Sequence, residues 1–376
     1  MQSYAFHLMP YRDSSDHAWP FPDDPWDPEL GHQYLNEYMD QLELADELGY
    51  DAVGINEHHF STHSTQPSPN LSAAHLAART EQADIAILGN IIGARRNPIR
   101  VAEEVAWVDN LTGGRVISGF PRGIPGEYLS YNVDWEESRA RHEEAWELVV
   151  KAWTAEEPFD WDGEFFEFEN VYVRPRPYQQ PHPPLWMAAV SEESLHYTAE
   201  KRVAVGVPFH PTAYIADVFS QFREIAGSEH GWTPEDDDFV VAKKVYVGET
   251  SEQAREVAEQ HLEFFYDRLE AIFLGVVSRF MGMDEYDPDQ YETVREHFPP
   301  DGDMAAEYDF DEYLESGAFI VGEPAEVVEQ LEAEYEQLGG FGRFAGLFQF
   351  GDMPHETVVG SMERYADEVM PEVAKL

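Results

Sequence analysis

One stretch decides the fold: Asp84–Tyr128, DIAILGNIIGARRNPIRVAEEVAWVDNLTGGRVISGFPRGIPGEY. Its apolar run 85–92 is typical of a strand buried on both faces of a parallel sheet. The pair Asn97-Pro98 then supplies an N-cap and a first-turn proline, and the glycines 113–114 end the helix. A second strand, 115–119, follows. The stretch therefore predicts a β-α-β unit with a right-handed crossover, as found in parallel sheets.

Strand and helix alternate in the same way along the rest of the chain. The predicted strands span residues 4–9, 51–56, 85–92, 115–119, 185–189, 203–206, 239–247 and 343–350. Further helices are predicted over 34–48, 71–82, 135–153, 191–201, 212–225, 251–269, 324–338 and 355–369. Eight strands alternating with helices predict an α/β fold, a (β/α)8 TIM barrel formed by residues 1–376 as one domain. A doubly wound open sheet is the alternative, and it is disfavoured because no G-x-G-x-x-G motif follows the first strand.

Three segments depart from this alternation. Residues 159–173 alternate in hydrophobicity around Asp162-Gly163, which predicts a β-hairpin outside the barrel. Residues 281–315 are acidic and aromatic and contain Pro299-Pro300, so we expect an insertion before the last strand. The loop 10–28 is rich in proline and aspartate, and a long loop after a strand is often functional.

The chain is strongly acidic. Its 376 residues include 74 acidic and 24 basic ones, which gives a formal charge of −50 spread along the whole sequence. This distribution favours adaptation to a salt-rich cytoplasm, where ions screen the self-repulsion of the surface. It also argues against nucleic acid as a partner, because there is no basic footprint.

Composition excludes several other classes of protein. Without cysteine there is no disulfide, thiolate metal site or cysteine nucleophile. The N-terminus lacks the basic and apolar regions of a signal peptide, and no uncharged stretch reaches transmembrane length. We therefore expect a cytoplasmic protein that does not enter a membrane.

Candidate functional residues follow the ends of the second and third predicted strands. His58 and His59 are adjacent, so on an extended chain they point in opposite directions and are poor ligands for one metal ion. We expect no metal site there, and instead a single histidine that faces a cavity and donates or accepts a proton. Two histidines hydrogen-bonded in a loop are the alternative. The pair Gly89-Asn90 is either a close packing point of the backbone with a hydrogen-bonded asparagine, or backbone exposed to a flat ligand.

A phosphate site is predicted beyond the fourth and fifth strands. Arg122 lies in a glycine-flanked loop, where its guanidinium can bind phosphate with two hydrogen bonds. Ser191–Ser194 begins a helix, and its free N–H groups form an anion site as well as a cap. Glu192 and Glu193 suit the helix dipole, but they would repel a phosphate if they faced it.

Four motifs together resemble the luciferase-like flavin-dependent monooxygenases, typified by the α subunit of bacterial luciferase. They are INEHHF (55–60), NPIRVAEEVAWVDNLTGGRVISGFPRG (97–123), WMAAVSEES (186–194) and GDMPHETVVGSMERYADEVMP (351–371). The similarity spans nearly the whole chain, and it is weakest in the loop 10–28 and the insertion 281–315, where we expect the substrate to be selected.

The resemblance implies a role for each candidate. His58 is the catalytic residue beside the reactive face of the flavin ring, and a non-proline cis peptide joins Gly89 and Asn90 beneath that ring. Arg122 binds the phosphate. The residues assigned to cofactor binding are Gly89, Asn90, Arg122, Ala189, Ser191 and Ser194. Luciferase carries a cysteine where this chain has Pro121, so light emission is not implied.

The expected function is that of a monooxygenase, in which reduced FMN and O2 oxygenate a small organic substrate. A separate flavin reductase is expected to supply the reduced FMN, because no nicotinamide-binding fingerprint is present. We also expect a homo-oligomer. One alternative is a deazaflavin-dependent oxidoreductase that transfers hydride on the same fold. Another is a non-catalytic flavin-binding protein, and the presence of both His58 and Arg122 counts against it.

Overall fold

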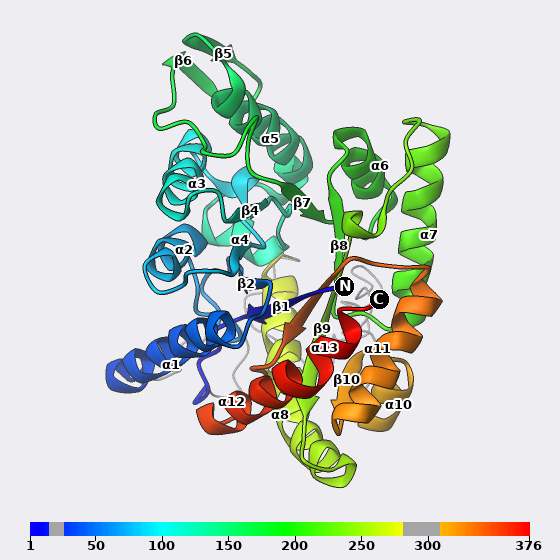
Figure 1. The fold of residues 1–376 in the computed structure, drawn as a ribbon. Helices are drawn as coiled ribbons and strands as arrows, with labels where there is room; N and C mark the ends of the chain where they lie inside the picture. Colours follow the sequence, from blue (N-terminus) through cyan, green and yellow to red (C-terminus); the bar gives the residue numbers. More distant parts are fainter. Residues whose placement is uncertain (15–25, 281–308) are drawn as a thin grey trace.

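The computed structural model describes residues 1–14, 26–280 and 309–376, and they contain a closed parallel barrel (Figure 1). Its strands, in hydrogen-bonding order, are β1 (Gln2–His7), β2 (Ala52–Ile55), β3 (Asp84–Ile87), β4 (Val116–Gly119), β7 (Leu185–Ala188), β8 (Ala204–Pro208), β9 (Phe239–Val247) and β11 (Arg343–Leu347). Pairing of β8 with β9 and of β11 with β1 closes the ring. The predicted (β/α)8 barrel is confirmed.

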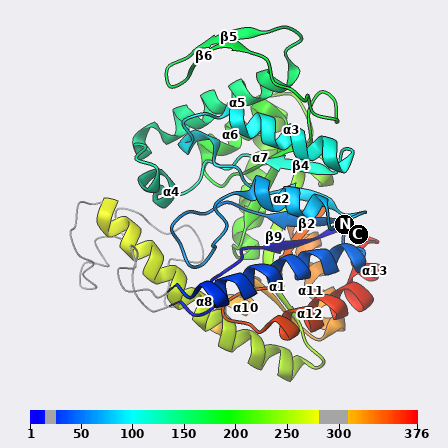
Figure 2. The same ribbon diagram turned by 90° about the vertical axis from the view of Figure 1, so that its left-hand side faces the viewer.

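Helices surround the barrel because each presents an apolar face to the strands (Figure 2). They are α1 (Pro28–Glu47), α2 (Pro69–Ala77), α3 (Ile99–Thr112), α5 (Ser138–Thr154), α6 (Glu192–Lys201), α7 (Thr212–Ser228), α11 (Pro324–Leu338) and α12 (His355–Arg364). The chain ends in a π-helical turn, Tyr365–Val369, and in α13 (Met370–Val373). None of the described helices is both long enough and apolar enough to cross a membrane.

Helix α1 begins six residues before its predicted start, because its cap lies within the loop rich in proline and aspartate. The Asp27 carboxylate accepts hydrogen bonds from the N–H groups of Glu29 (2.8 Å) and Leu30 (3.3 Å), and Pro28 occupies the first turn. Residues 15–25 of that loop lie outside the described residues.

Strand β3 is shorter than the apolar run 85–92 predicts. It ends at Ile87, and the chain then leaves the sheet and forms a 3-10 turn at Ile92–Ala94. Three of the described elements went unpredicted. They are α4 (Pro125–Ser130), a six-residue helix in the loop after β4, the helix α10 (Phe310–Glu315) within the expected insertion, and the strand β10 (Phe319–Gly322).

Strand β9 has nine residues and pairs with different neighbouring strands along its length. Its first part, Phe239–Lys244, pairs with β8 and β11 and belongs to the barrel. Its last part, Lys244–Val247, pairs with β10, which therefore lies outside the barrel as a ninth parallel strand. Helices α8 (Ser251–Phe280) and α10 (Phe310–Glu315) flank β10. Residues 281–308 of the expected insertion lie outside the described residues.

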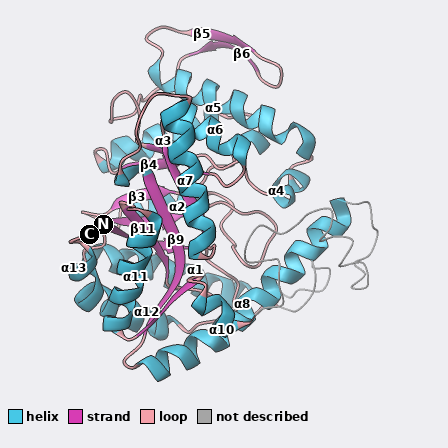
Figure 3. Ribbon diagram, turned by 90° about the vertical axis from the view of Figure 1, so that its right-hand side faces the viewer, coloured by secondary structure: helices cyan, strands magenta, loops and turns pink. Residues whose placement is uncertain are grey.

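The predicted hairpin is confirmed as a separate two-stranded antiparallel sheet of β5 (Phe159–Asp162) and β6 (Glu167–Val171). Figure 3 shows it beyond α5, away from the barrel strands. The Glu144 carboxylate of α5 holds its turn by accepting N–H groups from Glu164 (3.0 Å), Phe165 (2.9 Å) and Phe166 (3.0 Å). A Cβ atom on Gly163 would lie 1.9 Å from this carboxylate, so a larger residue there would displace the Glu144 carboxylate from the turn that it holds.

Candidate active site

A cavity of about 380 Å³ lies at the carboxyl ends of the barrel strands. This is the edge where α/β barrels carry their chemistry. The loops after β2, β3, β4, β7 and β8 line it. Six of the seven predicted site residues are among the lining residues: His58, Gly89, Arg122, Ala189, Ser191 and Ser194. The barrel therefore brings together residues that are up to 136 positions apart in the sequence (194 − 58).

Asn90 is the predicted residue that does not line this cavity. Its fully buried side chain donates to Asn70 Oδ1 (3.0 Å), and its N–H donates to the Gly119 carbonyl (2.9 Å). The expected cis bond between Gly89 and Asn90 is wrong. Within the described residues, the cis peptide bonds are Arg174–Pro175 and Gln180–Pro181. Asn90 matches the other interpretation of the sequence, a buried asparagine fixed by hydrogen bonds.

Gly89 exposes backbone to the cavity beside Pro121. A Cβ atom at position 89 would lie 2.6 Å from Pro121 Cγ, which is closer than real Cβ atoms approach a neighbour. The loops after β3 and β4 thus meet at a point that has room only for glycine. Pro121 itself lines the cavity.

His58 is oriented by a buried carboxylate. Its Nδ1 lies 2.8 Å from Oε1 of Glu127, a residue of α4 whose side chain is only 3% exposed. The other carboxylate oxygen of Glu127 accepts the N–H of Ile124 (2.6 Å), so the start of α4 fixes the carboxylate. A histidine held through one ring nitrogen has a defined tautomer and ring plane, and the other ring nitrogen is left for reactants.

A second histidine packs against the His58 ring. The ring centroids of His58 and His63 are 4.6 Å apart. Burial, and secondarily the neighbouring His58, hold the pKa of His63 well below its ordinary value, so His63 is neutral. His63 therefore supports the His58 ring without adding a positive charge to the site.

His59 points away from His58 and has its own carboxylate. Its Nε2 lies 2.6 Å from Glu57 Oε1, and the second oxygen of Glu57 accepts the Ile91 N–H (3.1 Å) and Arg95 Nη2 (2.8 Å). The two adjacent histidines thus diverge, as an extended chain requires. Through its hydrogen bond to the Ile91 N–H, Glu57 connects the segment after β2 to the backbone that follows Gly89.

Arg122 and Arg139 form the cationic end of the cavity. The Arg122 guanidinium lies 4.3 Å from the centre of the Trp135 ring, and it has no ion pair with a described carboxylate. Burial and then the positive charge of Arg139 lower the pKa of Arg122. Arg139 also lines the cavity and reaches Glu193 Oε2 at 3.5 Å. Two neighbouring arginines are suited to a doubly charged anion.

The first turn of α6 faces the same end of the cavity. Ser191 caps the helix, because its Oγ accepts the Ser194 N–H (3.4 Å), while Ser194 Oγ donates to the Ser191 carbonyl (2.7 Å). Neither Glu192 nor Glu193 lines the cavity, and the Glu193 side chain is 71% exposed. The Glu193 carboxylate nevertheless lies near both arginines, as its contact with Arg139 shows, so an anion in the cavity would compete with Glu193 for Arg139.

Trp186 forms a flat wall of the cavity. A Cβ atom on Gly119 would lie 1.9 Å from its Nε1, and one on Gly206 would lie 2.1 Å from its Cζ3. Glycines on the two neighbouring strands, β4 and β8, thus leave room for the indole to lie across both. The wall continues over apolar side chains from β1, β8 and β9 and the segments after them: Phe6, Leu8, Val207, Phe209, Val240 and Ala242.

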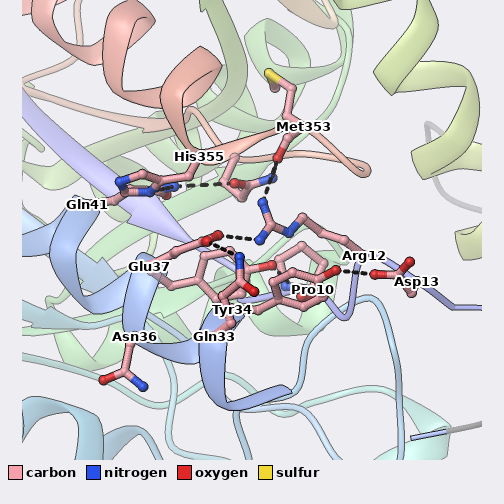
Figure 4. A network of polar contacts seen from close by, with 12 residues as sticks. Pro10, Arg12, Asp13, Gln33, Tyr34, Asn36, Glu37, Gln41, Met353 and His355 are labelled. Atoms are coloured by element: carbon pink, nitrogen blue, oxygen red, sulfur yellow. Dashed lines mark hydrogen bonds and ion pairs between the residues drawn. The ribbon is translucent and has the colours of Figure 1, made fainter. Parts of the chain in front are cut away.

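The chain that leaves the cavity after Leu8 is fixed by Arg12 (Figure 4). Arg12 pairs with Glu37 of α1, donates to the Met353 carbonyl (3.1 Å) and stacks on Tyr34, with Cζ 3.8 Å from the ring centre. Tyr38 donates to the Pro10 carbonyl (2.6 Å). The start of the first loop is therefore bound to α1 and to the segment before α12.

Glu127, Arg139 and His142 are site residues that the sequence did not single out. Glu127 escaped because a helix of six residues is too short to show a hydrophobic period. Arg139 and His142 lie in the first turns of the predicted helix 135–153, where charged residues are ordinary. Burial lowers the pKa of His142 to about 4, so it is neutral, and its Nε2 donates to the Phe120 carbonyl (2.8 Å).

These residues fit a flavin mononucleotide. The arginine pair and the first turn of α6 suit its phosphate, and the backbone of Gly89 with the Trp186 wall suits a flat ring. The fit rests on an arginine that lacks a carboxylate partner in a chain with 74 acidic residues.

Comparisons with known proteins agree with this geometry. The family model for luciferase-like monooxygenases matches residues 18–341. The oxygenase component of flavin-dependent trigonelline monooxygenase from Acinetobacter baylyi is 25% identical over 350 residues, which cover 92% of this chain and 91% of that protein.

Two solved structures share the fold. Monooxygenase RslO1 from Streptomyces bottropensis superposes with a TM-score of 0.76 at 25% identity, covering 99% of this chain and 100% of the other. The oxygenating constituent of 3,6-diketocamphane monooxygenase from Pseudomonas putida, in complex with FMN, also gives 0.76, at 19% identity and with 99% and 98% covered.

Proposed function

Because this chain belongs to the luciferase-like monooxygenase family, we propose that it oxygenates a small organic substrate with reduced FMN and O2. One observation carries the proposal. A half-buried arginine, Arg122, faces the cavity without a carboxylate partner, although the chain carries 74 acidic residues. Keeping such a cation unpaired is costly unless an anion binds it, and the phosphate of FMN is that anion.

The two ends of the cavity have different roles in this proposal. Arg122 and Arg139 bind the phosphate, together with the N–H groups at the start of α6. Reduced FMN supplies the electrons that activate O2. The Trp186 wall and the apolar strand residues exclude water from the ring and orient the substrate.

His58 handles a proton at the other end. Glu127 holds Nδ1, so Nε2 is the ring nitrogen that donates to or accepts from the reacting groups. Glu127 has no carboxylate oxygen left for the reacting groups, because both of its oxygens are hydrogen-bonded to other parts of the protein. It is therefore a positioning residue, whereas His58 is the proposed catalytic residue.

The proposed partners are a separate flavin reductase and a second copy of the chain. The reductase is proposed because the relative from Acinetobacter is the oxygenase component of its system. A second copy is supported by large apolar side chains exposed on two neighbouring helices. These are Leu71 (72% exposed) on α2, and Trp107 and Leu111 (56% each), one turn apart on α3. The acidic surface is in turn proposed to suit a salt-rich cytoplasm.

The test starts from flavin-free protein in high salt. Titration with reduced FMN and with the reduced deazaflavin is expected to give saturable binding of reduced FMN in preference. The His58→Ala variant is expected to bind FMN nearly as well as the parent, while O2-dependent substrate oxygenation falls. His75→Ala, which changes an exposed histidine on α2, is the matched control. Preferential binding of the deazaflavin, or oxygenation by His58→Ala at the parent rate, contradicts the proposal.

A further inference from the structure

A cluster of two imidazoles and one carboxylate lies on the outside of the barrel. His196 belongs to α6, and Glu229 and His230 directly follow α7. One possible ligand atom from each residue lies within 4.8 Å of the other two. His196 Nδ1 and Glu229 Oε2 are 3.1 Å apart. Among the described residues, this cluster is the one in which three histidine or acidic side chains lie close enough to share a metal ion. None of its residues lines the cavity of the candidate active site.

We propose that His196, Glu229 and His230 bind one divalent transition-metal ion of the Zn²⁺ class. Zn²⁺ binds imidazole nitrogen at about 2.0–2.1 Å and carboxylate oxygen at about 2.0–2.2 Å, so two ligands of a tetrahedral site lie about 3.4 Å apart. The three groups, whose ligand atoms lie within 4.8 Å of one another, are close to that spacing. A fourth position is left for water.

A second observation that supports a ligand at this cluster is the unpartnered ring nitrogen Nε2 of His230. Its Nε2 is shielded from solvent and has no hydrogen-bond partner in the part of the chain that the structure describes. A buried polar atom without a partner is costly in free energy. An exposed pair such as His196 and Glu229 contributes little by itself and does not explain why a second histidine is held beside it.

The backbone around the cluster is already fixed. Trp232 Nε1 donates to the Ala199 carbonyl of α6 (3.0 Å), and Arg202 Nη2 donates to the His230 carbonyl (3.3 Å). Gly231, at φ +67°, provides the turn between them. The segment after α7 is thus attached at two points, both just C-terminal to the ligands, to the last turn of α6 and to the Arg202 that follows it. Little ordering of the backbone is therefore needed for binding.

The choice of ligands separates this site from the general attraction of the surface for cations. A surface with a formal charge of −50 gathers Mg²⁺ and Ca²⁺ through its carboxylates, and salt screens that attraction. Imidazole favours Zn²⁺, Co²⁺ and Ni²⁺ instead. Binding at the proposed site should therefore persist in molar KCl and excess Mg²⁺.

The experiment is a calorimetric titration of chelator-treated, full-length protein with Zn²⁺ in molar KCl and excess Mg²⁺. We expect one Zn²⁺ per chain. Affinity should fall at least about tenfold in His196→Ala and in His230→Ala, and it should be unchanged in His75→Ala. With Co²⁺ as the probe, visible absorption bands of a low-coordinate site should appear in the parent and disappear in both variants.

The Glu229→Gln variant tests whether a loss of Zn²⁺ affinity comes from the loss of a ligand or from misfolding. The Glu229 side chain is 52% exposed, so the substitution leaves the fold intact, and circular dichroism checks this for every variant. Weaker Zn²⁺ binding by a folded Glu229→Gln supports the site. Equal binding by parent and His196→Ala, or binding that Mg²⁺ abolishes, shows adventitious surface binding only and overturns the proposal.

Discussion

His58 Nδ1 lies 2.8 Å from Glu127 Oε1, although 69 positions separate the two residues in the sequence. The contact joins the loop after β2 to the helix after β4, past the end of β3, which lies between these two strands. His58 therefore has an orientation that neither loop determines alone.

Glu127→Gln is expected to lower oxygenation about tenfold or more and leave FMN affinity nearly unchanged, because the charge that orients His58 is lost. The measurement is a double-mutant cycle on the oxygenation rate. Since Glu127 acts through the His58 ring, Glu127→Gln should have little further effect in a His58→Ala background. Independent, additive losses would show that Glu127 has another role.

Arg122→Ala is expected to weaken FMN binding by about 1.5–3 kcal/mol, the contribution of a hydrogen bond to a charged group. Fluorescence titration should show the loss for FMN but not for riboflavin, which lacks the phosphate. Arg100→Ala is the matched control, because Arg100 pairs only with Glu103 and Glu104 on the surface of α3. Equal losses for FMN and riboflavin would place Arg122 elsewhere than at the phosphate.

The barrel was predictable because its strands and helices are long enough to show periodic hydrophobicity. The six residues of α4 and the four of β10 are too few to show such a period. Because α4 was missed, its residue Glu127 was missed as well. The position of most of the site followed from the rule that strand ends carry chemistry. Asn90 is different, because the direction of its side chain depends on a hydrogen bond to Asn70 at the start of α2. The peptide conformation at Gly89 has no signature in the sequence.

Gly89→Ala is expected to destabilise the protein by about 1–3 kcal/mol and to weaken FMN binding, because the new methyl group overlaps the Pro121 ring. Chemical denaturation and FMN titration measure both effects. Adding Pro121→Ala removes the overlapping Cγ atom, so it should restore part of the stability. Gly227→Ala, which has open space around it in α7, should be neutral or stabilising, and a similar loss there would point to a general effect of losing glycine.

His142 makes stability depend on pH in a defined direction. Its pKa is about 4 in the folded chain and about 6.5 when unfolded, so the unfolded chain binds more protons between these values. The free energy of unfolding therefore decreases as pH falls from about 6.5 to 4, by up to about 1.4 kcal/mol per pH unit from this group. Urea unfolding of the parent and His142→Gln at several pH values should show their difference shrinking on acidification. A difference independent of pH would mean that His142 is not held neutral.

Low ionic strength is expected to destabilise the fold, because the Debye length grows from about 3 Å at 1 M salt to about 30 Å at 0.01 M. Thermal melts in molar and in millimolar KCl measure the effect. Sucrose at matched osmolality is the control, since it favours compact states without screening charge. If sucrose restores the melting temperature as fully as KCl does, screening of the −50 charge is not the cause.

The pairing of β1 with β11 has a consequence for biosynthesis. The partner of Gln2 is Arg343, so β1 cannot complete its pairing in the ring until β11, which is synthesised much later, has also been made. Until then β1 keeps an open edge, which is a template for mispairing with other chains. Contacts between segments so far apart in the sequence slow folding, and the barrel can be completed only after β11 has been synthesised. The yield of folded protein in a heterologous host therefore depends on whether the incomplete barrel avoids aggregation, and not only on the stability of the native barrel.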